Sequence, residues 1–378
     1  MTTFRLRRSI ASSAIVWLAS TACGSAANDA GEAEAAVTDA SPFDMRALDR
    51  SLFETGANTE GAVIQVNGKI VYERYAAGYD ERKRHLAYSV SKSVGTALLG
   101  LAIEDGLVRL DDSVCRHIRP PPGADPSLCD ATLGQLAGMT SGLAWNESYE
   151  DPVASNVLPM IYGDEGDTAH YVALRPRAKP AGSTWHYSSG DSNLLAGAIH
   201  AALGSRDMGA WANARLFGPA KLASAIFEED RAGTLLFASG VFMTPRDMAR
   251  FGQLYLDDGY VGPHRVLPEG WTAFTKTPVP PRATPTPHTG TGLDERGGSY
   301  GASFWLNAAT PDAPVDTLLY AGAPRDTYCA QGQWGQRICI VPSRKLVVVR
   351  VGNDRHGFYD VGPVVEAAVA AVDGSKEK

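Results

Sequence analysis

The stretch Ser89-Val90-Ser91-Lys92 opens an apolar run that extends from Val94 to Ile103, and this stretch decides how the rest of the chain is interpreted. The run predicts a buried helix that begins near Ser89. Residues i and i+3 share one face of a helix, so the Lys92 amine is expected to reach the Ser89 hydroxyl. Because a serine hydroxyl is a weak nucleophile that needs a neighbouring base, the pair predicts acyl transfer through a covalent serine ester.

The spacing of this serine and lysine is not specific by itself. The tail Ser375-Lys376-Glu377-Lys378 has the same spacing, but it lies in a charged terminus that is expected to fray. An alternative interpretation makes Ser89 a helix N-cap and Lys92 a solvated residue of the first turn. The apolar helix instead favours a rigidly held nucleophile at a helix N-terminus, where free N–H groups and the helix dipole stabilise an oxyanion.

The N-terminus has the pattern of a secretory signal peptide. Arg5, Arg7 and Arg8 precede an uncharged stretch over residues 9–22, which is too short to span a membrane as a mature helix. The segment that ends at Cys23 resembles a bacterial lipoprotein processing site, with Ser20 where a leucine is usual.

We therefore expect residues 1–23 to be a signal peptide whose Cys23 carries a lipid anchor, followed by an acidic linker over residues 24–50. The expected location is the periplasm or the cell envelope, with the membrane contacted through Cys23. Cleavage near Ser25-Ala26-Ala27 is the alternative, and it gives a soluble exported protein.

The cysteine count agrees with export. With Cys23 acylated, four cysteines remain, an even number for an oxidising compartment. The preferred disulfides are Cys115–Cys129, which closes a proline-rich loop, and Cys329–Cys339, which braces two adjacent strands. Four buried free thiols are the alternative.

The net charge argues against a nucleic-acid partner. The formal charge of the 378 residues is −7, and removal of the three signal arginines makes it −10 (−7 − 3). A chain this acidic, without a basic stripe, has little to attract a phosphate backbone.

Strand signals lie near both ends of the chain. Residues 62–72 contain two β-rich runs joined by Asn67-Gly68, and residues 337–351 contain a second predicted hairpin, followed by a helix over 361–372. Between them we expect helices at residues 133–138, 168–173, 192–203, 208–216 and 245–256, and an exposed loop over 278–298. The prediction is an α/β (α+β) domain over residues 51–378, with a central antiparallel sheet flanked by helices and a helical insertion over about 111–280.

A second polar cluster follows a turn, between Pro180 and Leu195. Tyr187 is its candidate functional residue, because a cationic lysine lowers the pKa of a neighbouring phenol and makes it a proton carrier. The alternative is a half-buried tyrosine that only stabilises the turn.

Together these segments resemble the serine β-lactamase and penicillin-binding-protein superfamily. The nearest part of it is the class C-like branch of esterases, D-amino-acid amidases and 6-aminohexanoate-dimer hydrolases. The resemblance runs from about Phe53 to Val372. Its motifs lie at residues 88–93 (YSVSKS), 136–143 (LAGMTSGL), 187–191 (YSSGD) and 243–252 (MTPRDMARFG).

This resemblance implies a β-lactamase/transpeptidase-like fold and assigns roles to individual residues. Ser89 matches the nucleophile, Lys92 the base that activates it, and Tyr187 the proton shuttle of the family's Y-x-N motif. Ser189 stands in the place of the motif's Asn.

The family's third motif, K-[ST]-G, is absent, and Ala330-Gln331-Gly332 stands in its place. The resemblance implies an oxyanion hole formed by the N–H groups of Ser89 and Gln333, with Ser189, Gln331 and Gly332 contacting substrate. The motif lysine helps to hold the carboxylate of penicillins, and a neutral Gln331 does not replace that charge. Esters or simple amides are therefore expected as substrates rather than β-lactams.

Other side chains have weaker assignments. Arg325 is a candidate cation for a substrate carboxylate or, equally, a surface residue paired with Asp326. Trp145, Trp334, Tyr149 and Tyr162 are candidates for an apolar acyl pocket or for the core. His186 adjoins Tyr187, but it alternates away from Tyr187 in an extended segment and receives no catalytic role.

Other chemistries find no support, because G-x-S-x-G, H-E-x-x-H, C-x-x-C and G-x-x-x-x-G-K-[ST] are all missing from the sequence. No metal or cofactor is expected. The leading hypothesis is an exported serine hydrolase of small esters or amides. A β-lactamase or D,D-carboxypeptidase is the second, and a non-catalytic cell-surface binding protein on the same scaffold is the third.

Overall fold

A computed structural model describes residues 43–163, 166–279, 299–307, 318–355 and 359–375. The predicted signal peptide, Cys23 and most of the acidic linker lie outside the described residues, as does residue range 280–298 of the predicted exposed loop. In the part of the chain that is described, no helix is both long enough and apolar enough to cross a membrane.

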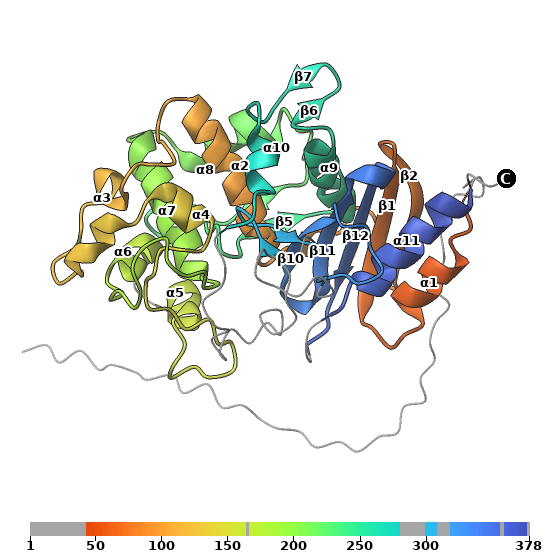
Figure 1. Ribbon diagram of the computed structural model, residues 1–378, viewed down its shortest axis with the longest axis horizontal. Coiled ribbons are helices and arrows are strands. Elements are labelled where there is room, and N and C mark those ends of the chain that lie inside the picture. Colours follow the sequence, from red (N-terminus) through yellow and green to blue (C-terminus); the bar gives the residue numbers. More distant parts are fainter. Residues whose placement is uncertain (1–42, 164–165, 280–298, 308–317, 356–358, 376–378) are drawn as a thin grey trace, which may run out of the picture. The chain divides into compact units, whose positions relative to one another are not determined.

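A seven-stranded sheet forms the centre of the fold, in the order β2-β1-β12-β11-β10-β9-β8 (Figure 1). All neighbouring strands are antiparallel, as predicted. The strands are β1 (Thr59–Val66), β2 (Lys69–Tyr75), β8 (Ser299–Tyr300), β9 (Trp305–Leu306), β10 (Tyr328–Gly332), β11 (Gln336–Val341) and β12 (Leu346–Gly352).

Both predicted hairpins are present. Asn67 and Gly68 join β1 to β2 with φ values of 51° and 74°, the positive pair that a tight type I′ turn requires. Between β11 and β12 the turn ends at Lys345, with a φ of 48°. The short strands β8 and β9 were not predicted from the sequence, because two residues give too little alternation to recognise. Strand β10 was implied by the preferred disulfide Cys329–Cys339, which was expected to brace two adjacent strands.

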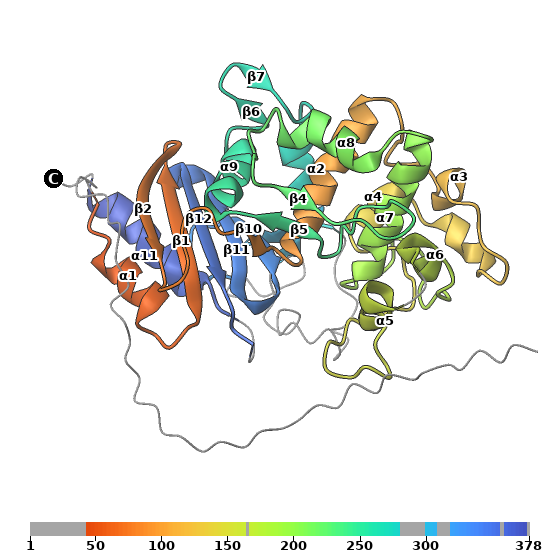
Figure 2. The ribbon, with the colours of Figure 1, turned by 180° about the vertical axis from the view of Figure 1, so that it is seen from behind.

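Helices cover both faces of the sheet (Figures 1 and 2). Side chains alternate between the faces along each strand, so Val347 and Val349 of β12 join one apolar core with α2 and α9, while Leu346 and Val348 join a second core with α1 and α11. The sheet is therefore buried on both sides, and α2 lies on the face opposite α11.

The helices are α1 (Arg46–Phe53), α2 (Val90–Glu104), α3 (Val114–His117), α4 (Leu133–Ala137), α5 (Val157–Tyr162), α6 (Thr168–Ala173), α7 (Ser189–Leu203), α8 (Met208–Ala212), α9 (Pro245–Leu256), α10 (Trp271–Thr275) and α11 (Gly362–Gly374). Most predicted helices agree with these bounds within two residues. Helix α7 begins three residues before the predicted start, because Ser188 caps it by accepting a hydrogen bond from the Asp191 N–H (3.0 Å). The predicted helix 208–216 changes after Ala212 into a π-helical turn, Asn213–Phe217.

The predicted insertion is mostly helical, but it also contributes strands. Its strands β5 (Val241–Met243) and β4 (Ile226–Phe227) form a three-stranded sheet with β3 (His85–Leu86), which precedes the insertion, in the order β3-β5-β4. A two-stranded ribbon joins β6 (Tyr260–Val261) to β7 (His264–Arg265). The structure has both disulfides that the sequence analysis preferred, Cys115–Cys129 and the directly opposed strand pair Cys329–Cys339.

Candidate active site

Ser89 lies where the chain turns from β3 into α2. Tyr88 before it has a φ of 47°, and Val90 begins the helix. Ser89 occupies the N-cap position, but its side chain makes no capping hydrogen bond. Its Oγ instead accepts a hydrogen bond of 3.0 Å from the Lys92 Nζ. The alternative interpretation of these residues as a cap and a solvated lysine is wrong, because the Lys92 residue is only 2% exposed.

Lys92 is buried among hydrogen-bond acceptors. Besides Ser89, its Nζ donates to the Ser189 Oγ and to the carbonyl oxygen of Ala238, at 2.9 Å each. Burial lowers the pKa of the Lys92 amine to about 8, although the nearby Glu147 carboxylate acts in the opposite direction. At this pKa a useful fraction of the amine is neutral near pH 7 to 8, so it can accept a proton.

A buried carboxylate that the sequence analysis missed lies next to this pair. Glu147 is fully buried, and its Oε1 accepts a hydrogen bond of 2.5 Å from the Ser189 Oγ. The backbone N–H of Ser189, the first residue of α7, donates to the other carboxylate oxygen at 2.8 Å. The Ser189 hydroxyl therefore bridges Lys92 and Glu147.

Two aromatic side chains complete the environment of Glu147. The Trp145 indole N–H donates to its Oε2 (2.5 Å), and the Tyr149 hydroxyl donates to its Oε1 (3.0 Å). These three residues alternate along one loop segment, which places their side chains on one side. That alternation is the only signal in the sequence for this carboxylate, and it has no meaning until the loop is folded against α7.

Tyr187 lies just before α7, in an aromatic cluster with Trp185, Tyr300 and Trp305. Its ring centroid is 5.0 Å from the Lys92 Nζ. Burial raises the pKa of the Tyr187 phenol well above its usual value, while a hydrogen bond with Ser89 acts to lower it. The structure thus brings Ser89, Lys92, Tyr187 and Ser189 together.

The end of β10 approaches the nucleophile from the sheet. The Gly332 Cα is so near to the Ala87 carbonyl that a Cβ there would lie 2.1 Å from its oxygen. Two residues after Gly332, Trp334 packs edge-on against Tyr88, with ring centroids 5.0 Å apart. Gln333 therefore lies between two residues that contact the chain on the N-terminal side of Ser89, next to the expected position of an oxyanion.

Two predicted contacts need correction. The Gln331 side chain does not face Ser89, because its Nε2 donates to the Tyr320 hydroxyl in the core beside α11. Its neighbour Ala330 packs in the other core, with α2. Arg325 precedes β10 at the end far from Gly332, so it cannot supply a cation beside Ser89.

The remaining aromatic candidates divide between the core and the surface. Trp145 is buried and holds Glu147, and its carbonyl oxygen lies 2.9 Å from the Nε2 of His186. Tyr162, at the end of α5, is 74% exposed. Among the described residues, no group of three or more His, Cys, Asp or Glu side chains is arranged to hold a metal ion.

Comparison with known proteins relates this chain to hydrolases. The sequence profile of the Beta-lactamase family matches residues 49–371. The chain is 26% identical over 319 residues to the 6-aminohexanoate-dimer hydrolase of Paenarthrobacter ureafaciens, with 81% of this chain and 75% of that protein covered.

Solved structures share the fold. One, described as a 6-aminohexanoate-dimer hydrolase from Bacillus anthracis, has a TM-score of 0.68 and 22% identity, covering 87% of this chain and 82% of that one. Another, a family VIII carboxylesterase, has a TM-score of 0.64 and 13% identity, covering 86% and 95%.

Proposed function

The chain belongs to the Beta-lactamase family, and from that membership we propose that it is a serine hydrolase that cleaves small esters or amides through an acyl-enzyme on Ser89. The observation that carries the proposal is the 3.0 Å hydrogen bond between the Lys92 Nζ and the Ser89 Oγ, in a position where the amine is shielded from water. A buried amine of lowered pKa beside a serine hydroxyl is the arrangement that nucleophilic catalysis requires.

In the proposed acylation step, neutral Lys92 takes the proton of Ser89 as the Oγ attacks the substrate carbonyl. The N–H groups of Ser89 and Gln333 stabilise the tetrahedral oxyanion. Collapse of this intermediate breaks the bond to the leaving group, which receives the proton from Lys92 through Tyr187. Water then attacks the Ser89 ester, and its proton passes through Tyr187 to neutral Lys92. Collapse of the second tetrahedral intermediate breaks the bond to the Ser89 Oγ, which takes that proton back from Lys92 as the carboxylic acid leaves.

The proposed substrate class rests on the wall of the site and on the relatives. Tyr88 and Trp334 flank Ser89 and Gln333 with half-buried aromatic rings, which suit a small apolar acyl group. The curated relative acts on 6-aminohexanoate dimer, an amide, and one structural neighbour is a carboxylesterase. We propose both bond types, without a preference for either.

The test uses p-nitrophenyl acetate and a fluorophosphonate probe on the purified protein. Turnover and a label that Ser89→Ala abolishes are expected. Ser183→Ala, at an exposed serine, is the control and should retain both. A folded protein with neither turnover nor label would exclude the proposal and favour a binding protein on the same scaffold.

We also propose that the protein is exported and anchored in the cell envelope through a lipid on Cys23. The basic and apolar N-terminus supports export, and pairing of the four other cysteines agrees with an oxidising compartment. Mass spectrometry of the mature protein tests this. A diacylglyceryl modification on an N-terminal Cys23 is expected, and a protein that begins after Ala27 would contradict it.

A further inference from the structure

The turn that carries Gln333 has an unusual backbone. Gln333–Gly335 join β10 to β11, and both Trp334 (φ 58°) and Gly335 (φ 91°) have positive φ. A residue such as Trp334 rarely adopts this conformation unless the surroundings enforce it. The groups that enforce it lie on the face of the sheet opposite Ser89.

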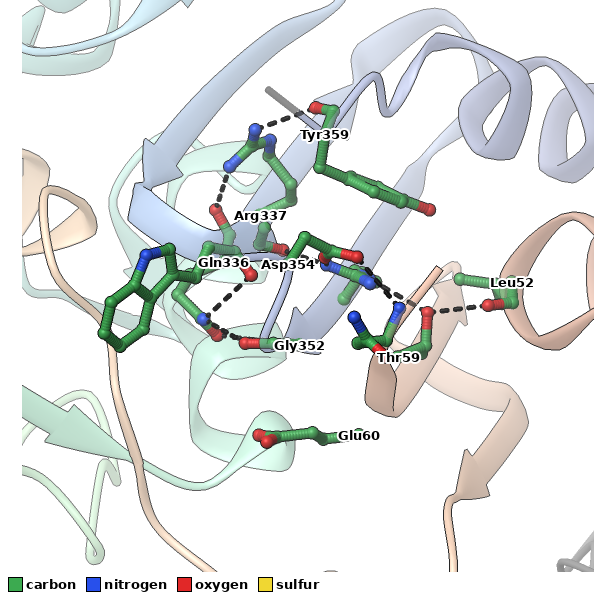
Figure 3. A network of polar contacts seen from close by, with 12 residues as sticks. Leu52, Thr59, Glu60, Gln336, Arg337, Gly352, Asp354 and Tyr359 are labelled. Atoms are coloured by element: carbon green, nitrogen blue, oxygen red, sulfur yellow. Dashed lines mark hydrogen bonds and ion pairs between the residues drawn. The ribbon is translucent and has the colours of Figure 1, made fainter. Parts of the chain in front are cut away.

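Arg337 is the first of these groups. It alternates with Ile338 along β11, and since Ile338 packs with α2, the Arg337 side chain lies on the α11 face. Its Nη1 donates to the carbonyl oxygens of Gly332 (2.6 Å) and Gln336 (2.9 Å), and its Nη2 donates to the Tyr359 carbonyl (2.8 Å). Figure 3 shows the guanidinium between Tyr359 and Gln336.

The contact with Gly332 determines the direction of one N–H group. In a trans peptide, the C=O of residue i and the N–H of residue i+1 point in opposite directions. Because Arg337 holds the Gly332 oxygen from the α11 side, the Gln333 N–H points away from Arg337, and we expect it to face Ser89. The oxyanion donor is thus aimed by a side chain that never meets the substrate.

We infer that Arg337 is a positioning residue for the oxyanion hole, which it orients by holding the Gly332 carbonyl from behind. This inference rests on the proposed acyl-enzyme function. A guanidinium that is 2% exposed is costly to bury, and this one donates to backbone carbonyls at both ends of the turn.

Neighbouring groups fix the rest of the turn. Arg350, opposite Arg337 in the register, donates to the Gly335 carbonyl (3.1 Å) and forms an ion pair with Asp354. The Asp354 N–H donates to the Trp334 carbonyl (3.1 Å), and the Gln336 amide donates to the Gly352 carbonyl (2.6 Å). These groups hold the rest of the turn in place, and Arg337 is the side chain among them that donates to the Gly332 oxygen, on the peptide that carries the Gln333 N–H.

Arg337→Met is the first test, because it removes the donors and keeps most of the length. We expect kcat for p-nitrophenyl acetate to fall about 10- to 100-fold with KM changed less than about threefold, since a misaimed donor is lost mainly in the transition state. The affinity for phenylboronic acid, which forms a tetrahedral adduct with serine, should fall in parallel with kcat/KM. Arg344→Met, in the same hairpin but paired with Asp373, should change neither.

Circular dichroism and a thermal melt establish that each variant is folded. If Arg337→Met does not fold, Arg337→Lys decides, because its single ammonium can reach one carbonyl but not all three. Loss of both kcat and boronate affinity in a folded variant supports the inference. Retention of kcat within threefold, or loss of kcat with unchanged boronate affinity, overturns it. If Ser89→Ala remains active, the proposed function itself fails, whatever Arg337 does.

Discussion

The side chains of Lys92 and Glu147 are joined by a single hydroxyl group, that of Ser189, which accepts a hydrogen bond from the amine and donates one to the carboxylate. The direction of these bonds matters. Because the Ser189 proton is committed to Glu147, the oxygen presents a lone pair to Lys92, which favours the ammonium form. Glu147 therefore opposes the effect of burial on the amine.

This relationship predicts the pH dependence of Glu147→Gln. The acidic limb of kcat/KM should lie near pH 8 in the parent protein, where Lys92 loses its proton. The amide removes the charge that raises the pKa of Lys92, so the limb should move about one pH unit lower. Glu104→Gln, at the exposed end of α2, is the matched control and should leave the limb in place.

The other titrating groups near Glu147 are not expected to shift the acidic limb of kcat/KM in this way. Burial raises the pKa values of Tyr149, Tyr187 and Tyr300 far above the pH range of this profile. Burial raises the pKa of Asp191 to about 7, but its carboxylate accepts hydrogen bonds from Ser141 rather than from Lys92. A limb that stays near pH 8 in a folded Glu147→Gln variant would show that Glu147 has only a structural role.

The end of β10 predicts weak β-lactamase activity. Ala330 is buried with α2, Gln331 faces Tyr320, and Gly332 has no side chain, so this strand offers no cation to a substrate carboxylate. We expect kcat/KM for nitrocefin to be at least about 100-fold below that for p-nitrophenyl acetate, the order that one lost charge-assisted hydrogen bond in a desolvated site can give. Steady-state kinetics with both substrates measure this ratio, and comparable values would refute the prediction.

The disulfide between β10 and β11 should contribute to stability. Cys329 and Cys339 are fully buried and close a loop with a sequence separation of 10. Their joint replacement by serine should lower the free energy of unfolding by about 2–4 kcal/mol, because the unfolded chain gains conformational entropy when the cross-link is removed. Urea denaturation measures the change. The Cys115/Cys129 double serine variant provides a comparison on the other disulfide, with a separation of 14.

Gly335 should not tolerate a side chain. Its φ of 91° disfavours any other residue, and a Cβ would lie 1.7 Å from the Arg350 Nη1. Gly270 has a φ of 75° with open space around it, so Gly270→Ala measures the backbone strain alone, about 1 kcal/mol. Gly335→Ala should cost a further 1–3 kcal/mol, roughly, for the displacement of Arg350. Equal losses in the two variants, measured by urea denaturation, would contradict this account.

Local sequence predicted the parts of the site that lie on one element. The helix after Ser89 and the i, i+3 spacing to Lys92 follow from apolar periodicity, and the two hairpins follow from Asn67-Gly68 and the β-rich runs. Tyr187 was recognised only in combination with Ser89 and Lys92, because its own segment is not distinctive.

Tertiary structure alone reveals the rest. Glu147 is an ordinary acidic residue in a loop until α7 folds over it. The four hydrogen bonds that its carboxylate then accepts come from the Trp145 indole, the Tyr149 hydroxyl, and the backbone N–H and hydroxyl of Ser189. Arg337 is one charged residue in a strand, and nothing local indicates that it is buried under a turn. The prediction that Gln331 contacts substrate was wrong because it rested on the motif at residues 330–332. The alternation of side chains along β10 turns Gln331 toward Tyr320.

The order of the strands has a consequence for how the protein matures. Strand β12 lies between β1 and β11, so the middle of the sheet is filled by a segment that is far from β1 along the chain. A nascent chain that ends before Leu346 has β1 and β11 but nothing to join them, and contacts so distant in sequence form slowly. We therefore expect the central sheet to close only after the chain has been synthesised through Gly352.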